Sequence, residues 1–512
     1  MTWAAVLVET AYFSVLSVLA LYGLHRLSLV HAWLRHRRSG GSPLFPPAGG
    51  ALGGMPTLPT VTVQLPIYNE YYVVQRLVHA ACALTYPRAK LEIQVLDDST
   101  DGTSALAAEL VASYRARGVD IHHIRRTDRR GYKAGALAEG MSRARGTLFA
   151  IFDADFIPPS GFLMETVPRF AADSALGMVQ ARWGHVNRDY SLLTRAQALL
   201  LDGHFVVEHG ARSATGRFLN FNGTAGILRR DCIEQAGGWQ DDTLTEDLDL
   251  SYRAQLAGWK FEYLGGLLVP AELPVEFNSL RSQQRRWAKG SVQTAMKLAG
   301  RVVRAPLPRV VKMEALVHLT NNVCYLLLAM LAMLIVPALA VRPEGDSRFL
   351  PADVLLFLAG SGSFALFCAV AQRETRKDWR RALLQLPAMM ALGIGLCLNN
   401  ALAVIEALRG QVSEFHRTPK HRIATQAGAA TGSWRTSSYQ AQSSWLVVVE
   451  AAFAVWFAAA IVMAVRQGRF ASLPFLGLFE SGFLYVTILT VAQDLSRRFT
   501  LWTARPAEAP AP

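Results

Sequence analysis

The chain has 512 residues, of which 51% are hydrophobic and only 18% charged, with a formal net charge of +13. This composition excludes an ordinary soluble protein and suits a chain that combines membrane helices with a soluble domain. The charge does not indicate nucleic-acid binding, because basic residues concentrate beside apolar segments, as at 373–381, the pattern of cytoplasmic loops in membrane proteins. The five scattered cysteines lack the spacing of a zinc site or a disulfide framework.

The first apolar segment, residues 4–24, is preceded by no basic residue and followed directly by His25 and Arg26. This order of charge is the reverse of a cleavable signal peptide. The sequence therefore predicts a retained transmembrane anchor within residues 1–30, with its N-terminus outside. Residues 31–60 are first basic and then rich in Gly and Pro, which predicts a linker.

Strand-like and helix-like segments alternate over the next stretch, residues 61–300. Runs of β-branched residues at 61–65, 91–96 and 147–152 predict strands, and helical spacing of apolar residues at 70–84 predicts a helix. This alternation predicts an α/β domain with a parallel sheet, which binds ligands at the carboxyl ends of its strands. Three polar motifs stand at such ends: Tyr68-Asn69-Glu70, Asp97-Asp98 and Asp153-Ala154-Asp155.

Residues 301–495 are predicted to form a membrane domain. Four apolar segments within it are each close to the ~20 residues that cross a membrane as a helix. They are 316–341, 352–371, 445–465 and 473–491. Together with the anchor they give five spans, which would place the α/β domain on the cytoplasmic side.

The apolar segment 387–408 is ambiguous, because basic residues stand on both sides of it. A single crossing would put one of these basic runs outside, against the usual tendency. We therefore expect an interfacial helix within a cytoplasmic helix-and-loop segment, 385–440. The end of the chain, 496–512, is predicted to be a disordered tail with no further domain.

Asp153-Ala154-Asp155 carries two carboxylates at the end of a buried strand. Residues two apart on a strand point to one face, so both carboxylates can approach one cation. Mg²⁺ or Mn²⁺ prefers such oxygen ligands and takes its other ligands from water and phosphates. A lone motif of this kind is more often a turn, but two charges after the apolar run 148–152 need a partner.

Asp97 and Asp98 end the preceding strand, where a carboxylate can accept hydrogen bonds from a nucleobase or ribose. The alternative is that they simply cap the helix that follows. Lys133 lies in the small-residue segment 131–137, which permits close backbone approach. It could meet a phosphate or neutralise a structural carboxylate.

Thr245-Glu246-Asp247 opens a predicted helix in which five acidic residues crowd nine positions: Asp241, Asp242, Glu246, Asp247 and Asp249. Capping by Thr245 and the helix dipole explain one or two of them. Repulsion between like charges would raise the pKa of one carboxylate toward the range of a general base. Asp247 is the candidate base, and Glu246 a candidate ligand for the acceptor.

Gln283, Arg286 and Trp287 share a face of a predicted helix. A guanidinium suits a diphosphate and an indole suits the face of a sugar, although the same residues also anchor helices at a membrane surface. In the loop 221–226, Asn222 and Gly223 could meet an acceptor sugar. The basic loop 415–420 stands at the expected membrane face.

In this order the motifs closely resemble the membrane-bound family 2 glycosyltransferases, and within them the cellulose-synthase-like branch that makes β-mannan and β-glucan. The resemblance covers about residues 61–290. Besides the motifs above it includes Gln180-Ala181-Arg182-Trp183.

The resemblance implies a GT-A-type, Rossmann-like domain between transmembrane helices, which inverts the anomeric carbon of a nucleotide sugar with Mg²⁺ or Mn²⁺. It implies nucleotide-sugar binding by Tyr68, Glu70, Asp97, Asp98, Lys133 and Asp153, a metal at Asp153 and Asp155, and catalysis by Asp247 with Glu246. Gln283, Arg286, Trp287, Asn222 and Gly223 would bind the diphosphate and the acceptor. The family covers its nucleotide with a loop of pattern FxVTxK; here Phe415, Thr418 and Lys420 are kept, but Arg417 replaces Val and Pro419 precedes the Lys.

Three functions follow as hypotheses. The first is a processive β-glycan synthase in the inner membrane of a bacterium, using UDP-glucose or GDP-mannose, extending a glycan acceptor and exporting it, with export or regulatory partner subunits. The second is a transferase that adds one sugar to a lipid. The third is a nucleotide-sugar-binding protein without catalysis, which the intact Asp155 and Asp247 disfavour. The sequence does not name the sugar, the linkage or the oligomeric state.

Overall fold

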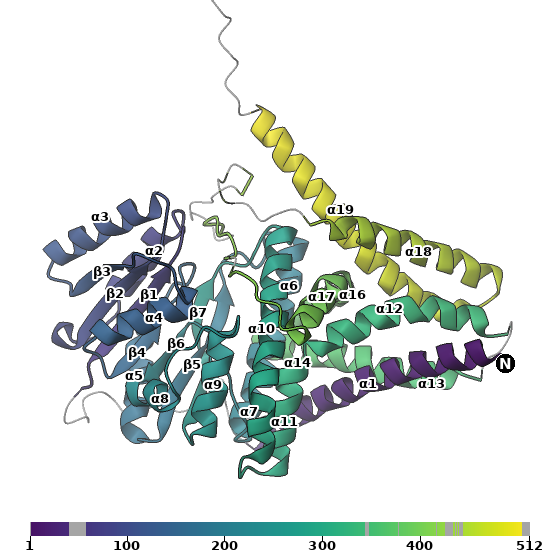
Figure 1. Cartoon of the computed structure of the whole chain (residues 1–512), viewed down its shortest axis with the longest axis horizontal. Helices are drawn as coiled ribbons and strands as arrows, with labels where there is room; N and C mark the ends of the chain where they lie inside the picture. Colours follow the sequence, from purple (N-terminus) through teal and green to yellow (C-terminus); the bar gives the residue numbers. More distant parts are fainter. Residues whose placement is uncertain are drawn as a thin grey trace, which may run out of the picture.

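The structure is a computed structural model that describes residues 2–39, 58–343, 348–376, 378–415, 417–424, 434–435, 437, 439 and 444–503. A sheet covered by helices stands at one end and a group of long apolar helices at the other (Figure 1). Most of the Gly- and Pro-rich part of the expected linker and the last nine residues of the expected tail lie outside the described residues.

A seven-stranded sheet in the order β3-β2-β1-β4-β6-β5-β7 forms the centre of the α/β region. The first four strands are parallel, as expected, and β1, β2 and β4 end at the predicted motifs. The strands are β1 (Val61–Ile67), β2 (Leu91–Asp97), β3 (Ile121–Arg125), β4 (Leu148–Ile151), β5 (Leu176–His185), β6 (Gly226–Arg229) and β7 (Lys260–Ala271).

The expected parallel sheet has an exception in β6, which runs antiparallel to both β4 and β5. Because of this direction, the start of β6 at Gly226 pairs with Ile151 at the carboxyl end of β4. The loop that precedes β6 is thereby brought to the edge of the sheet where the acidic motifs lie. One antiparallel strand thus adds Asn222 and Gly223 to that edge.

Helices cover both faces of the sheet, as in other α/β proteins. On one face, α2, α3 and α5 pack on inward side chains such as Val63 and Ile93. On the other face, α4, α8 and α9 pack on Phe149 and Ile151. The bounds are α2 (Val74–Cys82), η2 (Arg88–Lys90), α3 (Thr103–Ala116), α4 (Tyr132–Arg143), α5 (Phe162–Ala172), α8 (Arg230–Gln235) and α9 (Glu246–Leu256).

Among the described residues, five helices are long and apolar enough to cross a membrane, the number of spans that the sequence predicts. They are α1 (Trp3–Arg38), α12 (Val323–Val341), the run Leu350–Thr375, α18 (Leu446–Arg466) and the helix that contains α19 (Leu473–Thr503). The run is made of α13 (Leu350–Phe357), η4 (Leu358–Gly362) and α14 (Ser363–Thr375), and η5 (Phe470–Ser472) precedes α19.

Two expected boundaries are wrong. Helix α1 continues to Arg38, so the first basic residues of the expected linker are helical. Helix α19 continues to Thr503, so residues 496–503 of the expected disordered tail are helical as well. Contacts with the α/β region explain this extension, because Arg497 of α19 pairs with Glu276 at 3.2 Å.

The ambiguous apolar segment forms two helices, α16 (Leu386–Gly395) and α17 (Cys397–Leu408), after the short α15 (Trp379–Leu383). The axis bends by 41° between Gly395 and Cys397. By length and composition this bent pair fits either a broken sixth span or a re-entrant segment, so the expected interfacial placement stays a prediction.

The two regions meet at a layer of helices that Figure 1 shows between the sheet and the apolar helices. The long helix α10 (Phe277–Arg304) carries Arg281, which pairs with the buried Glu450 of α18 at 2.7 Å. Arg285 and Lys289 of α10 both pair with Glu406 of α17. The rest of the layer consists of α6 (Leu192–Asp202), η3 (Gly203–His209), α7 (Gly210–Ala214) and α11 (Arg309–Thr320).

Candidate active site

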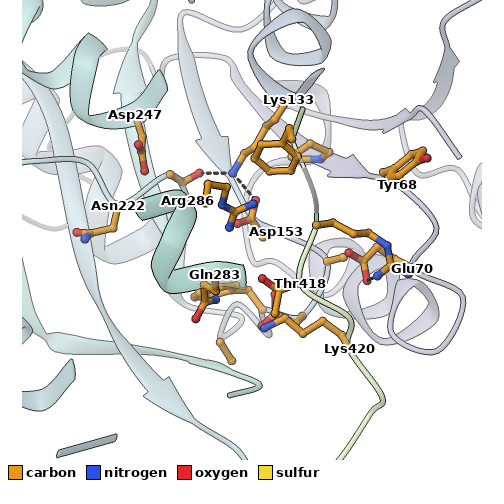
Figure 2. A pocket seen from close by; sticks show the side chains of 18 of the residues that line it. Tyr68, Glu70, Lys133, Asp153, Asn222, Asp247, Gln283, Arg286, Thr418 and Lys420 are labelled. Carbon is orange, nitrogen blue, oxygen red and sulfur yellow. Dashed lines mark hydrogen bonds and ion pairs between the residues drawn. The ribbon is translucent and has the colours of Figure 1, made fainter. Parts of the chain in front are cut away.

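A pocket opens at the edge of the sheet where β1, β2 and β4 end, and helices α9 and α10 close its far side. All the residues singled out from the sequence line it except Asp97. They are Tyr68, Glu70, Asp98, Lys133, Asp153, Asp155, Asn222, Gly223, Glu246, Asp247, Gln283, Arg286 and Trp287. Figure 2 shows how ten of the lining side chains lie around it.

Asp97 does not line the pocket. Its carboxylate is buried, lies 2.8 Å from His123 Nε2 and accepts a hydrogen bond from the Ser99 backbone. Burial would raise the pKa of Asp97, but these hydrogen bonds lower it to about 2. The geometry therefore gives Asp97 a structural place at the end of β2, while its neighbour Asp98 faces the pocket.

Two arginines that the motif analysis missed stand beside the first motifs. Arg126 donates to both oxygens of Asp98, and the Arg129 guanidinium lies 3.4 Å from the ring centre of Tyr68. Both follow β3 directly, so their position at the end of a parallel strand was the signal that could have found them. The pair of Tyr68 and Arg129 offers a flat, cationic surface to a nucleobase.

Lys133 connects the two sides of the pocket. From the first turn of α4 its ammonium lies 2.5 Å from Asp153 Oδ1 and donates to the Gly223 carbonyl at 3.0 Å (Figure 2). Burial alone would lower the pKa of Lys133, but the charges of Asp153 and Glu246 raise it overall. Lys133 is therefore a permanent cation in a pocket otherwise rich in carboxylates.

Asp153 and Asp155 differ in their surroundings. Asp153 faces the pocket, whereas the buried Asp155 accepts hydrogen bonds from Lys420 Nζ at 2.8 Å and from the Glu272 backbone at 3.2 Å. One oxygen of each carboxylate receives no hydrogen bond from the described residues, so the donor chemistry fits a divalent cation. Within the described part of the chain, no group of three or more His, Cys, Asp and Glu side chains is placed to hold a metal, so phosphates and water would have to complete the ligand set.

The loop 415–420, with His416 outside the described residues, passes over this part of the pocket. Arg417 pairs with Glu70 at 3.2 Å, and Phe415 lies under the Arg286 guanidinium at 4.4 Å from its ring centre. Burial raises the pKa of Glu70 to about 8, although the charge of Arg417 opposes this. Arg417, which departs from the family pattern, is thus placed as the partner of a buried carboxylate.

Asp247 stands in the first turn of α9. A Cβ atom at Gly223 would lie 2.8 Å from Asp247 Oδ2, so any larger residue at this position would displace the carboxylate. Burial, then the charge of Glu246, raises the pKa of Asp247 to about 7, although Lys133 opposes them. This is the range that the crowding of acidic residues predicted for a general base.

The crowding itself has a simpler explanation for two of the other three acids. Asp242 and Asp249 both pair with Lys297, at 2.7 and 3.0 Å, and Asp249 also pairs with Arg253. Only Glu246 and Asp247 line the pocket. The expected cap by Thr245 is wrong in detail: Thr245 holds the cap position, but its hydroxyl lies 3.3 Å from that of Thr294 and accepts no hydrogen bond from the helix.

Helix α10 presents Gln283, Arg286 and Trp287 to the pocket, while Arg281, Arg285 and Lys289 face the membrane helices. Burial lowers the pKa of Arg286, against the opposing charges of Glu246, Asp153 and Asp247. Sequence reasoning also missed His185, which lines the pocket at the end of β5; both its ring nitrogens are buried and accept or donate no hydrogen bond among the described residues. Burial lowers the pKa of His185 to about 4, so the ring is neutral.

The fold and the pocket define a GT-A-type glycosyltransferase domain. Residues 59–290 match the family model described as "Glycosyltransferase like family 2". The chain is 47% identical over 250 residues to glucomannan 4-beta-mannosyltransferase 9 of Arabidopsis thaliana, covering 48% of this chain and 47% of that protein. It is 41% identical over 313 residues to the probable glucomannan 4-beta-mannosyltransferase 4 of Oryza sativa subsp. japonica, covering 58% and 56%.

Residues 59–290 of the chain are thus similar to the family 2 glycosyltransferases, and the curated relatives are glucomannan 4-beta-mannosyltransferases, as in the cellulose-synthase-like branch. It spans about half the length of the curated relatives it matches. A mannosyltransferase from Pyrobaculum calidifontis, solved in complex with GDP-Man and Mn²⁺, shares the fold with a TM-score of 0.53 at 21% identity, over 77% of this chain and 99% of the other. The curated relatives named here are plant proteins, so they do not support the bacterial membrane expected from the sequence.

Proposed function

We propose that the protein is an inverting hexosyltransferase that extends a β-linked glycan, a mannan or a glucan, from a nucleotide sugar at a membrane. In this proposal residues 61–300 are the catalytic domain, on the cytoplasmic side, and residues 301–495 are the membrane domain. GDP-mannose is the first donor to test, because the curated relatives are named as mannosyltransferases. UDP-glucose is the second.

One observation carries the proposal. Asp247, with a pKa of about 7, lies at the same pocket as a cluster of cations that can hold a diphosphate, Lys133 and Arg286. A base that is partly ionised near neutral pH can take the proton of an acceptor hydroxyl. Fixed cations at the leaving diphosphate stabilise charge that develops in the transition state. A protein that binds nucleotide sugars without transferring them does not need such a base.

The residues divide into two groups. The donor side consists of Tyr68, Asp98, Lys133 and Asp153, where Tyr68 and Asp98 meet the nucleoside and Lys133 the diphosphate. The acceptor side consists of Asn222, Gly223 and Asp247, with Trp287 as a face for the sugar. Asp153 and Asp155 would hold a Mg²⁺ or Mn²⁺ ion, which would supply positive charge to the diphosphate.

In the transfer step the Asp247 carboxylate takes the proton from a hydroxyl of the acceptor sugar. The hydroxyl oxygen forms a bond to the anomeric carbon, and the bond from that carbon to the diphosphate breaks. The electron pair leaves with the nucleoside diphosphate, whose charge Lys133 and Arg286 neutralise. Attack from the face opposite the diphosphate inverts the anomeric carbon and gives a β-linkage from an α-linked donor.

The test is incorporation of radiolabelled sugar by the full chain in lipid nanodiscs, from GDP-mannose or UDP-glucose with Mn²⁺ or Mg²⁺. We expect a high-molecular-mass product from one donor, and no product with EDTA or with Asp247→Asn. The Asp247→Asn protein should still bind the nucleotide, which calorimetry would measure. Label found only in a small lipid-soluble product would show that the protein makes a glycolipid and not a polymer. Binding of the nucleotide sugar without any transfer would overturn the enzyme proposal.

A further inference from the structure

A cluster of buried polar side chains lies behind Asn222 and plays no part in the mechanism above. It begins at His204, whose Nε2 lies 3.1 Å from the side-chain nitrogen of Asn222. His204 stands in η3, a segment of π-helix between α6 and α7. Such segments are rare and are found disproportionately at functional sites.

Glu208 determines which nitrogen of His204 carries the proton. Its carboxylate lies 2.8 Å from His204 Nδ1. Burial would raise the pKa of Glu208, but the hydrogen bond with His204 and the charge of Arg212 hold it well below its usual range. The ionised carboxylate can only accept a hydrogen bond, so Nδ1 of His204 donates and, in the neutral ring, Nε2 is left as an acceptor.

His204 Nε2 lies 3.1 Å from the Asn222 side-chain nitrogen and also 3.1 Å from His209 Nε2, so both neighbours share this acceptor. Of the two polar atoms of the Asn222 amide only the nitrogen can donate to it, so the carbonyl oxygen Oδ1 points the other way. This oxygen is buried and accepts no hydrogen bond from the described residues. Because Asn222 lines the pocket, a hydroxyl of a sugar bound there is the donor that Oδ1 lacks.

The backbone around Asn222 is held by other side chains. Gln255 binds the backbone of Leu219, Ser251 accepts from the Phe221 N–H at 2.8 Å, and Gln180 accepts from the Asn222 N–H at 2.9 Å. None of these contacts reaches the Asn222 side chain. His204 therefore acts on the amide alone, and its loss should leave the loop in place.

The His204 segment is itself fixed against the membrane helices. A side chain at Gly203 would lie 2.3 Å from the Phe367 ring of α14, and one at Gly210 would lie 2.2 Å from Trp33 of α1. Three further contacts extend the buried chain from Glu208 toward α1. Arg212, 3.8 Å from Glu208, donates to Glu314 at 3.0 Å, and Glu314 lies 2.7 Å from His25 of α1.

We propose that His204 is a positioning residue that, held by Glu208, aims the amide oxygen of Asn222 at a hydroxyl of the acceptor sugar. The inference rests on the proposed function and adds to it a determinant of acceptor binding. Its support is geometric: a carboxylate–histidine–amide chain that ends in a buried oxygen of a residue lining the pocket, and this oxygen accepts no hydrogen bond from the described residues.

The test compares His204→Ala, Asn222→Ala and the double variant in nanodiscs, with mannohexaose and cellohexaose as acceptors. For His204→Ala we expect the KM for the better acceptor to rise about tenfold and the KM for the donor to stay within about twofold. The double variant should be no worse than either single one, because both remove the same contact. His204→Gln, whose amide oxygen can accept from Asn222, should recover part of the loss.

His122 provides the matched control. It also pairs with a carboxylate, Asp120, at 2.8 Å, but on β3 and away from the pocket. His122→Ala should leave both KM values unchanged. Additive effects in the double variant, or equal changes in the donor and acceptor KM, would overturn the inference and leave His204 a structural residue.

A separate readout keeps the inference apart from the proposed function. Binding of mannohexaose, followed by tryptophan fluorescence with nucleoside diphosphate present, needs no catalysis. If the wild-type protein transfers no sugar but binds the hexasaccharide more tightly than His204→Ala does, the proposed function fails and the inference stands. If transfer occurs and the two proteins have equal acceptor affinity and KM, the inference fails alone.

Discussion

The donor side and the acceptor side of the pocket are built in different ways. On the donor side, side chains at the ends of adjacent parallel strands pair directly, as Arg126 after β3 does with Asp98 after β2. On the acceptor side, Asn222 and Asp247 come from the loop before an antiparallel strand and from a helix, and side chains of other elements hold Asn222. The first arrangement depends on the sheet, and the second on packing between the sheet and the membrane helices.

This difference suggests separate tasks. A nucleoside diphosphate is the same molecule in every turnover, so a rigid strand edge can serve it. An acceptor that grows or varies has to be bound by side chains whose orientation is set by residues outside the pocket. Variants on the donor side should therefore change donor binding and catalysis, and variants on the acceptor side should change acceptor binding with little effect on the donor.

The largest effect after loss of Asp247 is expected from Asp153→Asn. This change removes a carboxylate that faces the diphosphate and leaves the Lys133 ammonium without its partner at 2.5 Å. We expect kcat/KM to fall at least about 100-fold, with acceptor affinity unchanged. Steady-state kinetics over a range of Mn²⁺ concentrations measure it.

Asp173→Asn is the control for this prediction, because Asp173 also pairs with a lysine, Lys260 at 3.0 Å, but at an exposed site. It should behave as wild type. If Asp153→Asn keeps full activity at every Mn²⁺ concentration, Asp153 has no role in holding the ion or the diphosphate.

A smaller effect is expected for Arg417→Ala. Arg417 pairs with Glu70 and lies over the Tyr439 ring at 4.0 Å, so it fixes the loop above the donor side. Without it we expect the KM for the donor to rise about tenfold and kcat to change by less than about threefold. Arg435→Ala, which removes an exposed arginine of the same segment, is the control. An equal rise in the acceptor KM would contradict the division between the two sides.

Much of the donor side could be predicted from the sequence, because its signals are local. A buried strand followed by Asp153-Ala154-Asp155 or by Asp97-Asp98 places carboxylates at a strand end wherever the sheet is parallel. The structure gives Asp97 and Asp98 different places. Asp97 turns inward to His123, whereas Asp98 faces the pocket. That choice depends on a histidine 26 residues away on a neighbouring strand, which no local pattern contains.

The acceptor side could be predicted only in part. Asp247 and Asn222 could be selected by their residue types. The antiparallel direction of β6, which brings Asn222 to the pocket, could not be predicted from the sequence. The contact of His204 with Asn222 joins two segments 18 residues apart in the chain, and on the donor side that of Arg417 with Glu70 joins segments much further apart. Such contacts are decided by tertiary packing, so sequence periodicity does not show them.

The part of the pH dependence that Glu246 controls should report the acceptor side. Asp247 must be ionised to accept a proton, so kcat/KM should rise with pH to a plateau with a midpoint near its pKa of about 7. Since the charge of Glu246 contributes to that raised pKa, Glu246→Gln should move the midpoint to lower pH, while the affinity for the nucleotide should show no such shift. A midpoint that stays in place in Glu246→Gln would assign the titration to another group.

The same raised pKa has a consequence for stability. A carboxyl that binds its proton more tightly in the folded protein stabilises the fold below its unfolded pKa of about 4, and this contribution is lost as the pH rises through about 7. The free energy of unfolding should therefore decrease over this range. Asp247→Asn should abolish that part of the decrease and be the more stable protein at pH 8, as thermal unfolding in detergent would show.

The smallest effect is expected for Ser251→Ala, which tests how the acceptor side is held. The Ser251 hydroxyl accepts from the Phe221 N–H at 2.8 Å and donates to the Asp247 carbonyl at 2.5 Å, so it ties the loop before β6 to α9. Its removal leaves a buried N–H without a partner, and we expect a loss of about 1–3 kcal/mol in the free energy of unfolding. Ser142→Ala, at an exposed position of α4 where the hydroxyl donates to the Glu139 carbonyl, should cost less than about 0.5 kcal/mol.

The acceptor KM of Ser251→Ala gives a second result. If it rises by only a few fold while the donor KM is unchanged, the loop is held redundantly and the Asn222 side chain, aimed by His204, carries acceptor binding. An increase in the acceptor KM as large as that caused by Asn222→Ala would instead show that acceptor binding depends on the position of the backbone, which Ser251 holds.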